Sequence, residues 1–195
     1  MMGLHPCSVK ENWKDELNLV EKLLAEKKYL AVGEIGIDLY WDKTFVKEQV
    51  TVFRKQIELA NHYKLPVSIH SRESFEEIYS ILLDTKKEMP CGIFHCFTGN
   101  ADQAQRAIGL GFYLGIGGVV TFKNSGLDKV LEQIDLKYLV LETDAPYLAP
   151  VPFRGKRNLP EYIVKVAEKV AEVKKTSLEE VARVTSENSK LIFGV

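Results

Sequence analysis

Short apolar runs alternate with longer amphipathic segments along most of the chain. This alternation is typical of βα units, in which strands pair in parallel and helices cover the sheet. The predicted strands are residues 1–4, 30–33, 67–70, 92–95, 112–116 and 138–141. After the last of these runs, the pattern predicts helices alone. We therefore expect an α/β fold built on a parallel sheet.

Helical periodicity and capping signals place helices between the strands. Apolar stripes at helical spacing predict helices that begin near Phe45, Leu159 and Leu178. Three Ser-x-x-Glu sequences are typical of helix starts, because the serine side chain can bond the free N–H groups of the first turn. They begin at Ser8, Ser74 and Ser177.

Four of the apolar runs stop at a residue that can bind a metal. Three of the runs stop at Glu34, His70 and His95, and the fourth stops at Glu142-Thr143-Asp144, of which Asp144 is the candidate ligand. Glycines flank Glu34 on both sides, and a glycine lets other groups approach the backbone closely. In a parallel α/β barrel, side chains from separate strand ends converge on one pocket. We therefore expect the four side chains to share a site for a divalent cation.

Length and charge narrow the fold class and the type of partner. A chain of 195 residues suits one core and is short for two, so we expect a single domain over residues 1–195. Lys and Arg total 26 against 27 Asp and Glu, so overall charge does not indicate attraction to nucleic acid. Any affinity for phosphate must be local.

The cysteines and the N-terminus indicate a compartment. Cys7, Cys91 and Cys96 form no Cys-x-x-Cys pair, and we interpret them as buried, reduced thiols rather than a disulfide framework. The N-terminus shows no basic segment followed by a long apolar core, and no window approaches the length of a membrane span. We expect a cytoplasmic protein without a membrane partner.

Basic and aromatic residues near the predicted strand ends give local support for phosphate binding. Arg72 follows His70, and a loop beyond Asp144 carries three cations, Arg154, Lys156 and Arg157. The planar fork of arginine suits phosphate oxygens, although a basic loop can also be simply solvated. Tyr40 and Trp41 either stack on nucleobases or plug the barrel mouth.

Motifs around these residues resemble the TatD-related deoxyribonuclease family, which comprises metal-dependent hydrolases with an amidohydrolase-type (β/α)8 barrel. The matching stretches are GLHP at 3–6, GEIGID at 33–38 with Tyr40 and Trp41, PVSIHSR at 66–72, FHCFTG at 94–99, GFYLGIGG at 111–118, ETDAPYL at 142–148 and RGKRN at 154–158. They occur in the order of the family and cover nearly the whole chain.

The resemblance implies a role for each predicted ligand. It implies that Glu34 bridges two divalent cations and that His70 and His95 complete the shell of the second. Asp144 would serve the first cation together with a His-x-His pair. The implied reaction is hydrolysis of DNA phosphodiester bonds, exonucleolytic and acting on single strands or 3′ ends. Glu34 and Asp144 would be catalytic, with Asp144 taking the proton of the attacking water.

The sequence departs from the family at its N-terminus. Family members begin with a strand that ends in His-x-His and with a second strand, and neither precedes the Gly-x-His-Pro motif here. We therefore expect an incomplete TIM-type barrel of about six parallel strands that lacks the first two. Its exposed edges would pair in a homo-oligomer. Activity would be weak or absent.

The same departure limits the metals. The family holds up to two ions, and loss of the His-x-His pair predicts one or none in this chain. Two carboxylates and water suit Mg2+ or Mn2+ better than Zn2+ at the first position. Two alternatives stay open: hydrolysis of another ester or an amide, and a non-catalytic truncated remnant. His5 either lines the pocket as a substrate-binding residue or frays with the chain end.

Overall fold

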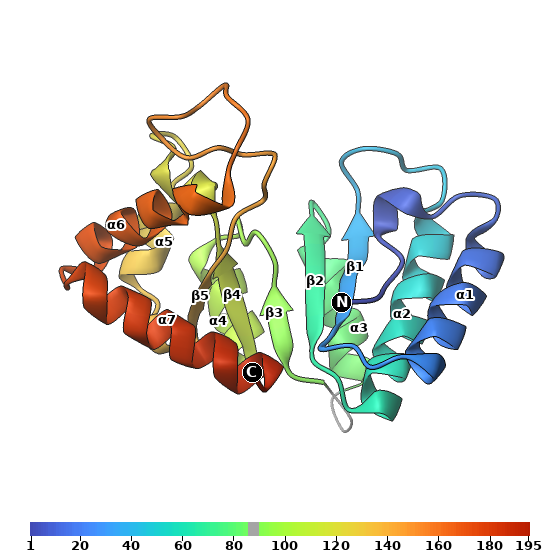
Figure 1. Ribbon diagram of the computed structural model, residues 1–195. Coiled ribbons are helices and arrows are strands. Elements are labelled where there is room, and N and C mark those ends of the chain that lie inside the picture. Colours follow the sequence, from blue (N-terminus) through green and yellow to red (C-terminus); the bar gives the residue numbers. More distant parts are fainter. Residues whose placement is uncertain (86–89) are drawn as a thin grey trace. The chain divides into compact units, whose positions relative to one another are not determined.

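The computed structural model describes residues 1–85 and 90–195, and Figure 1 shows its strands and helices. The chain forms two compact units, Met1–Phe94 and His95–Val195. Each unit combines parallel strands with helices that lie against them. The expectation of one domain over the whole chain stays a prediction.

In the first unit, strands and helices alternate as the hydrophobic pattern predicts. The strands are β1 (Val32–Asp38), β2 (Val67–Arg72) and β3 (Gly92–Phe94). The helices are α1 (Trp13–Glu26), α2 (Val46–Tyr63) and α3 (Phe75–Asp84), and a short 3-10 helix, η1, covers Pro6–Ser8. β2 pairs in parallel with both β1 and β3. Helix α2 packs on β1, and α3 contacts β1 and β2 (Figure 1).

The apolar stripe predicted after Phe45 holds α2 against the strands. Phe53, Ile57 and Ala60 are fully buried on this helix, which confirms the predicted face. Burying side chains of this kind contributes roughly 1.5–3 kcal/mol for each large one relative to leaving it in water. Helix α2 therefore shields the face of β1 on which it packs from solvent.

The expected strand at residues 1–4 is wrong. Within the described chain, Met2 makes an isolated parallel bridge to Val32. At Leu4, the buried side-chain amide of Gln56 takes the place of a neighbouring strand, because its Oε1 accepts the Leu4 N–H at 2.6 Å and its Nε2 donates to the Leu4 carbonyl at 3.1 Å. The described residues thus form five strands where six were predicted.

β1 carries an irregularity at the position of Glu34. Val32 pairs with Val67, and Ile35 pairs with Ile69. Three steps along β1 therefore match two steps along β2, and Glu34 lies in the extra length. The sequence placed Glu34 at the end of a strand, whereas β1 continues past it for four more residues. A bulge of this kind changes the direction of the side chain that it contains.

The glycines beside Glu34 allow the backbones of β1 and β2 to approach. A Cβ at Gly33 would stand 2.8 Å from the Cβ of Ser68. A Cβ at Gly36, where φ is +149°, would overlap the carbonyl oxygen of His70. The close approach expected from the sequence is present at both glycines.

The second unit repeats the combination of strands and helices. β4 (Phe112–Ile116) pairs in parallel with β5 (Leu139–Leu141). The helices are α4 (Ala101–Gly109), α5 (Leu127–Glu132), α6 (Ile163–Lys174) and α7 (Leu178–Phe193), with 3-10 helices η3 (Gly118–Thr121), η4 (Leu136–Tyr138) and η5 (Pro160–Tyr162). Helix α4 packs on β4, and α7 packs on β5 and on α6 (Figure 1). The strand at 112–116 and the two C-terminal helices confirm the sequence pattern.

The three predicted helix starts have different outcomes. Ser177 caps α7, because its side chain accepts the N–H of Glu180 at 3.1 Å. Ser74 occupies the cap position of α3, but its hydroxyl donates to the carbonyl of Ile37 instead of bonding the helix. Ser8 lies in η1 and not at the start of α1, so that prediction is wrong.

The cysteines correct one expectation from the sequence. Cys7 and Cys91 are exposed, and Cys96 is half-buried, so the interpretation of all three as buried thiols is wrong. Cys7 lies in the short η1 helix, and Cys91 directly precedes β3. In residues 1–85 and 90–195, every helix is too short or too polar to span a bilayer.

Candidate metal centre

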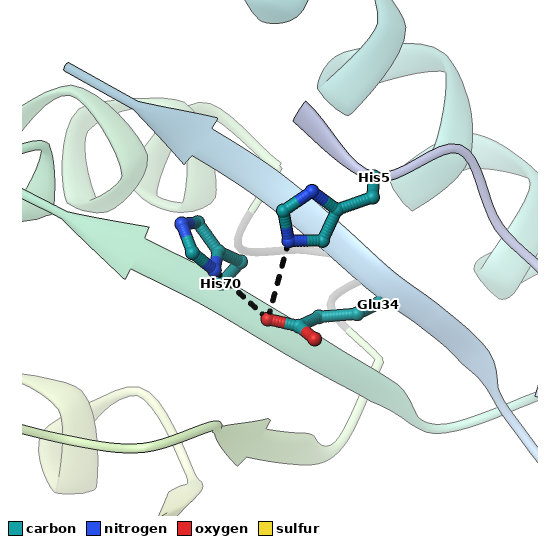
Figure 2. A group of neighbouring side chains, drawn as sticks. All are labelled: His5, Glu34 and His70. Atoms are coloured by element: carbon teal, nitrogen blue, oxygen red, sulfur yellow. Dashed lines mark hydrogen bonds and ion pairs between the residues drawn. The ribbon is translucent and has the colours of Figure 1, made fainter. Parts of the chain in front are cut away.

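Three side chains of the first unit meet beside β1 and β2 (Figure 2). Glu34 Oε1 lies 2.9 Å from His70 Nδ1 and 3.6 Å from His5 Nε2. One ligand atom from each of the three residues lies within 4.8 Å of the others. Carboxylate oxygen and imidazole nitrogen are ordinary protein ligands of divalent metals. The donor set of this cluster fits a divalent cation.

The hydrogen bonds of His5 distinguish it from His70. Nδ1 of His5 accepts the backbone N–H of Cys7 at 3.1 Å, so the proton of the neutral ring is on Nε2, which faces Glu34. A protonated ring nitrogen has no lone pair for a metal. A cation that binds Nε2 of His5 must therefore displace this proton, and the substrate-binding role predicted for His5 stays a prediction.

Both ring nitrogens of His70 face carboxylates. Nδ1 contacts Glu34, and Nε2 lies 2.8 Å from Oδ2 of Asp38. Burial lowers the pKa of His70, but the hydrogen bonds to Glu34 and Asp38 outweigh this effect and hold the pKa above its ordinary value. A cation that binds Nδ1 must therefore displace a proton from the ring.

Asp38 is buried although it carries a charge. Its Oδ1 accepts the backbone N–H groups of Tyr40 and Trp41, both at 2.9 Å, and its Oδ2 faces His70. Burial raises the pKa of Asp38, but the hydrogen bonds from Trp41, His70 and Tyr40 outweigh it and hold the pKa below its ordinary value. Asp38 therefore remains an ionised acceptor of three hydrogen bonds.

The second unit contains a similar set of contacts around His95. Nδ1 lies 2.9 Å from Glu142 Oε2, and Nε2 lies 3.5 Å from Asp144 Oδ1. The other oxygen of Glu142 accepts the backbone N–H of Cys96. A Cβ at Gly115 would overlap the Glu142 carboxylate, so the glycine leaves room for it.

The four predicted ligands are divided between the two units. Glu34 and His70 are in contact in the first unit, and His95 and Asp144 are in ion-pair distance in the second. Their convergence on a shared cavity stays a prediction.

Sequence reasoning missed Asp38 and Glu142 as site residues. A signal was present for both, because Asp38 lies within a short apolar stretch and Glu142 directly follows one, and a carboxylate in such a place is rarely without partners. The identity of those partners depends on the register between strands. Sequence spacing does not give that register.

Tyr40 and Trp41 form an aromatic platform after the end of β1, and Arg72 at the end of β2 packs against it. The guanidinium carbon of Arg72 lies 4.1 Å from the ring centre of Tyr40 and 5.2 Å from that of Trp41. The two rings meet edge to face at 4.8 Å, and both are exposed. The predicted substrate-binding residues Tyr40, Trp41 and Arg72 thus lie together, and both interpretations of the two aromatic residues stay predictions.

The predicted basic loop lies between β5 and α6. Arg154, Lys156 and Arg157 are exposed there. The guanidinium carbon of Arg154 lies 3.7 Å from the ring centre of Phe122, and both residues line an open depression of about 380 Å³ that also includes Lys123. This part of the second unit therefore offers cationic groups next to an aromatic ring.

Comparison with known proteins identifies the family of this chain. The family model described as TatD related DNase matches residues 1–194. The chain belongs to the TatD family. The resemblance stated from the motifs is therefore confirmed.

Relatives of this TatD-family chain are named as hydrolases. An uncharacterized metal-dependent hydrolase of Bacillus subtilis, YabD, is 43% identical over 195 residues, which are 100% of this chain and 76% of YabD. An uncharacterized metal-dependent hydrolase of Escherichia coli, YcfH, is 35% identical over 99% of this chain and 72% of its own length. The chain therefore belongs to a family whose members are named metal-dependent hydrolases.

Solved structures show the same fold. The crystal structure of YjjV, a TatD homologue from Escherichia coli, matches with a TM-score of 0.93 and 31% identity, over 100% of this chain and 76% of YjjV. A TatD-family hydrolase from Entamoeba histolytica matches with a TM-score of 0.77 over 94% of this chain and 69% of its own, at 24% identity. The predicted fold class, an α/β fold of the TIM-barrel type, is confirmed.

Proposed function

We propose that this TatD-family hydrolase is a deoxyribonuclease that removes nucleotides from single-stranded DNA or from 3′ ends. One observation carries the proposal: a single carboxylate joins the aromatic platform to a candidate metal ligand. Asp38 bonds His70 through Oδ2 and holds the backbone of Tyr40 and Trp41 through Oδ1. A base stacked on the platform would thus lie beside the candidate ligands.

The charges of the chain support a phosphate-bearing substrate. The net charge is −1, so attraction to DNA must come from local groups. The guanidinium of Arg72 packs on the ring of Tyr40, and in the second unit the guanidinium of Arg154 packs on the ring of Phe122. Guanidinium groups of this kind pair with phosphate oxygens through charge-assisted hydrogen bonds.

Each predicted site residue has a distinct part in the proposed reaction. When bound, a divalent cation such as Mg2+, Mn2+ or Zn2+ supplies charge that polarises the phosphoryl group and acidifies water. Glu34 and His70 would hold it in the first unit. Asp144 would accept the proton of the attacking water. His5 would donate its Nε2 proton to a phosphate oxygen.

The test is cleavage of a single-stranded oligonucleotide labelled at either end, in Mg2+ or Mn2+. We expect a ladder that shortens from one end. We also expect Glu34→Gln and Asp144→Ala to reduce the rate by at least about a hundredfold, since the first removes a charge that would hold the cation and the second removes the acceptor of the water proton. Equal rates for the wild type and Asp144→Ala would refute the proposal.

The names of the relatives leave a second candidate, because they state a metal-dependent hydrolase without a substrate. Loops determine the substrate of a barrel enzyme more than the fold does. A panel of carboxyesters, lactones, amides and phosphodiesters separates the candidates. Turnover confined to substrates without phosphorus would favour the second candidate over the deoxyribonuclease.

A further inference from the structure

We propose that two carboxylates held by backbone N–H groups, Asp38 and Glu142, are positioning residues for metal binding. Each fixes which ring nitrogen of the histidine beside it offers a lone pair to a divalent cation. The two units contain the same arrangement without sharing a residue: a histidine stands between a less exposed carboxylate, which accepts a backbone N–H, and a more exposed carboxylate predicted to bind metal. This inference goes beyond the proposed function, because it does not depend on the substrate.

In the first unit, the arrangement selects Nδ1 of His70. The side chain of Asp38 is 2% exposed and faces Nε2, whereas that of Glu34 is 29% exposed and faces Nδ1. Both carboxylates can only accept a hydrogen bond, but Asp38 is buried and two backbone N–H groups hold its Oδ1, so it stays against His70, whereas the more exposed Glu34 is free to turn toward a cation. The proton of a neutral His70 ring therefore stays on Nε2. The lone pair is then on Nδ1, on the side of Glu34.

In the second unit, the arrangement selects the opposite nitrogen. The side chain of Glu142 is 13% exposed and faces Nδ1 of His95, whereas that of Asp144 is 35% exposed and faces Nε2. The same reasoning places the proton of His95 on Nδ1 and its lone pair on Nε2, toward Asp144. A carboxylate behind a metal-binding histidine sets the ring orientation and tautomer in this way.

The substitution Asp38→Asn tests the inference because the new amide has one allowed orientation. The N–H groups of Tyr40 and Trp41 require an acceptor, so the amide oxygen must remain where Oδ1 is now. The amide NH2 then faces Nε2 of His70, which must accept, and the proton moves to Nδ1. We expect the affinity for Mn2+ to fall about ten- to a hundredfold.

Asp42→Asn is the matched control. Asp42 divides its oxygens in the same way as Asp38, because Oδ1 accepts the Thr44 N–H at 2.9 Å and Oδ2 pairs with Lys10 Nζ at 2.7 Å. Oδ2 of Asp42 faces a lysine, whereas Oδ2 of Asp38 faces a histidine, so Asp42→Asn changes no histidine tautomer. We therefore expect this variant to keep the Mn2+ affinity of the wild type.

Glu142→Gln extends the test to the second unit. The Cys96 N–H holds one side-chain oxygen, so the amide NH2 would face Nδ1 of His95. We expect the proton of that ring to move to Nε2. This variant also decides the matter if Asp38→Asn does not fold.

Two measurements are made on the full-length protein and need no substrate. Calorimetric titration with Mn2+ gives the metal affinity, and NMR of protein labelled with 15N histidine, in EDTA at alkaline pH, gives the tautomer of each of the four histidines. Thermal unfolding in EDTA reports the integrity of the fold. We expect changed tautomers and weaker Mn2+ binding in Asp38→Asn and Glu142→Gln, with the melting temperature of the wild type in EDTA.

Unchanged tautomers in both variants would overturn the inference, whatever the Mn2+ affinity. A loss of Mn2+ affinity matched by Asp42→Asn, or accompanied by an equal loss of thermal stability in EDTA, would assign Asp38 a structural role and also overturn it. If the wild type binds no Mn2+, the tautomers alone decide. A chain that fails to cleave DNA but shows the expected tautomers refutes the proposed function and leaves this inference standing.

Discussion

Gly36 faces His70 across β1 and β2, and a side chain there has no space. The His70 carbonyl occupies the position of a Cβ, and the φ of +149° is one that residues with a side chain rarely adopt. The contact between Glu34 and His70 depends on the close approach of these two backbones. Gly36, which has no side chain, thus determines how Glu34 and His70 are placed relative to each other.

Gly36→Ala should therefore destabilise the protein by about 1–3 kcal/mol, because the backbone must strain or the strands must separate. Urea unfolding of the metal-free protein measures this change. Gly109→Ala is the control, since a Cβ there has no neighbour within 4 Å and Gly109 lies in α4, so we expect no loss. Equal stability of Gly36→Ala and the wild type would contradict the argument.

At this scale, the sequence predicted residue types better than contacts. Glu34 and His70 were predicted as neighbours, and they touch. The role of Asp38 was not predicted, because it follows from the pairing of Gly36 with His70 and Asp38 with Arg72 across the strands. Periodicity along one strand carries no information about that pairing.

Among the elements, α7 begins where the Ser-x-x-Glu sequence predicted a helix start. Ser177 and Glu180 were identified from spacing alone, and the side chain of Ser177 bonds the Glu180 N–H. The same spacing at Ser8 failed, because His5 and Pro6 begin a 3-10 helix there. A capping signal therefore predicts a helix start only where the preceding residues leave the chain extended.

Ser177→Ala should lower the free energy of unfolding by about 1 kcal/mol, since one N–H of the first turn loses its partner. Ser8→Ala should change it by less than about 0.5 kcal/mol, because Ser8 caps no α-helix and is exposed. Thermal or urea unfolding of both variants compares them directly. A larger effect at Ser8 than at Ser177 would show that the cap does not stabilise α7.

Element boundaries were harder to predict than element types. The helices after Asp144 and the strand at 112–116 matched the pattern, because each buries a continuous set of apolar residues that the spacing in the sequence reveals. The cap of α4, formed by Asn100 and Gln103, was overlooked although its Asn-x-x-Gln spacing is visible in the sequence. The bulge at Glu34 could not be predicted, since it is a property of two paired strands.

For the molecule as a whole, metal binding and stability should be linked. A ligand that binds only the folded state stabilises it by about 2.7 kcal/mol at a hundredfold excess over its dissociation constant. Metal-free protein should therefore melt at a higher temperature when Mn2+ is added, and EDTA should reverse the shift. Glu34→Gln should remove most of it, because the carboxylate charge at the first-unit cluster is lost. A shift of the same size in Glu34→Gln would place the ion elsewhere.

The assembly, location and partner of the chain were also predicted from the sequence. Homo-oligomerisation through exposed sheet edges, cytoplasmic location and DNA as the partner stay predictions. The chain aligns with 76% of the length of YabD and with 76% of YjjV.

Gln56 links helix α2 to the position of the His5 side chain. Its amide grips the main chain of Leu4, one residue before His5, and so ties the position of that imidazole to a helix that carries no predicted reactive group. A grip on the main chain is indifferent to which side chain occupies position 4. A change at residue 56 would therefore shift the His5 imidazole from inside the fold, while every predicted metal ligand keeps its own side chain.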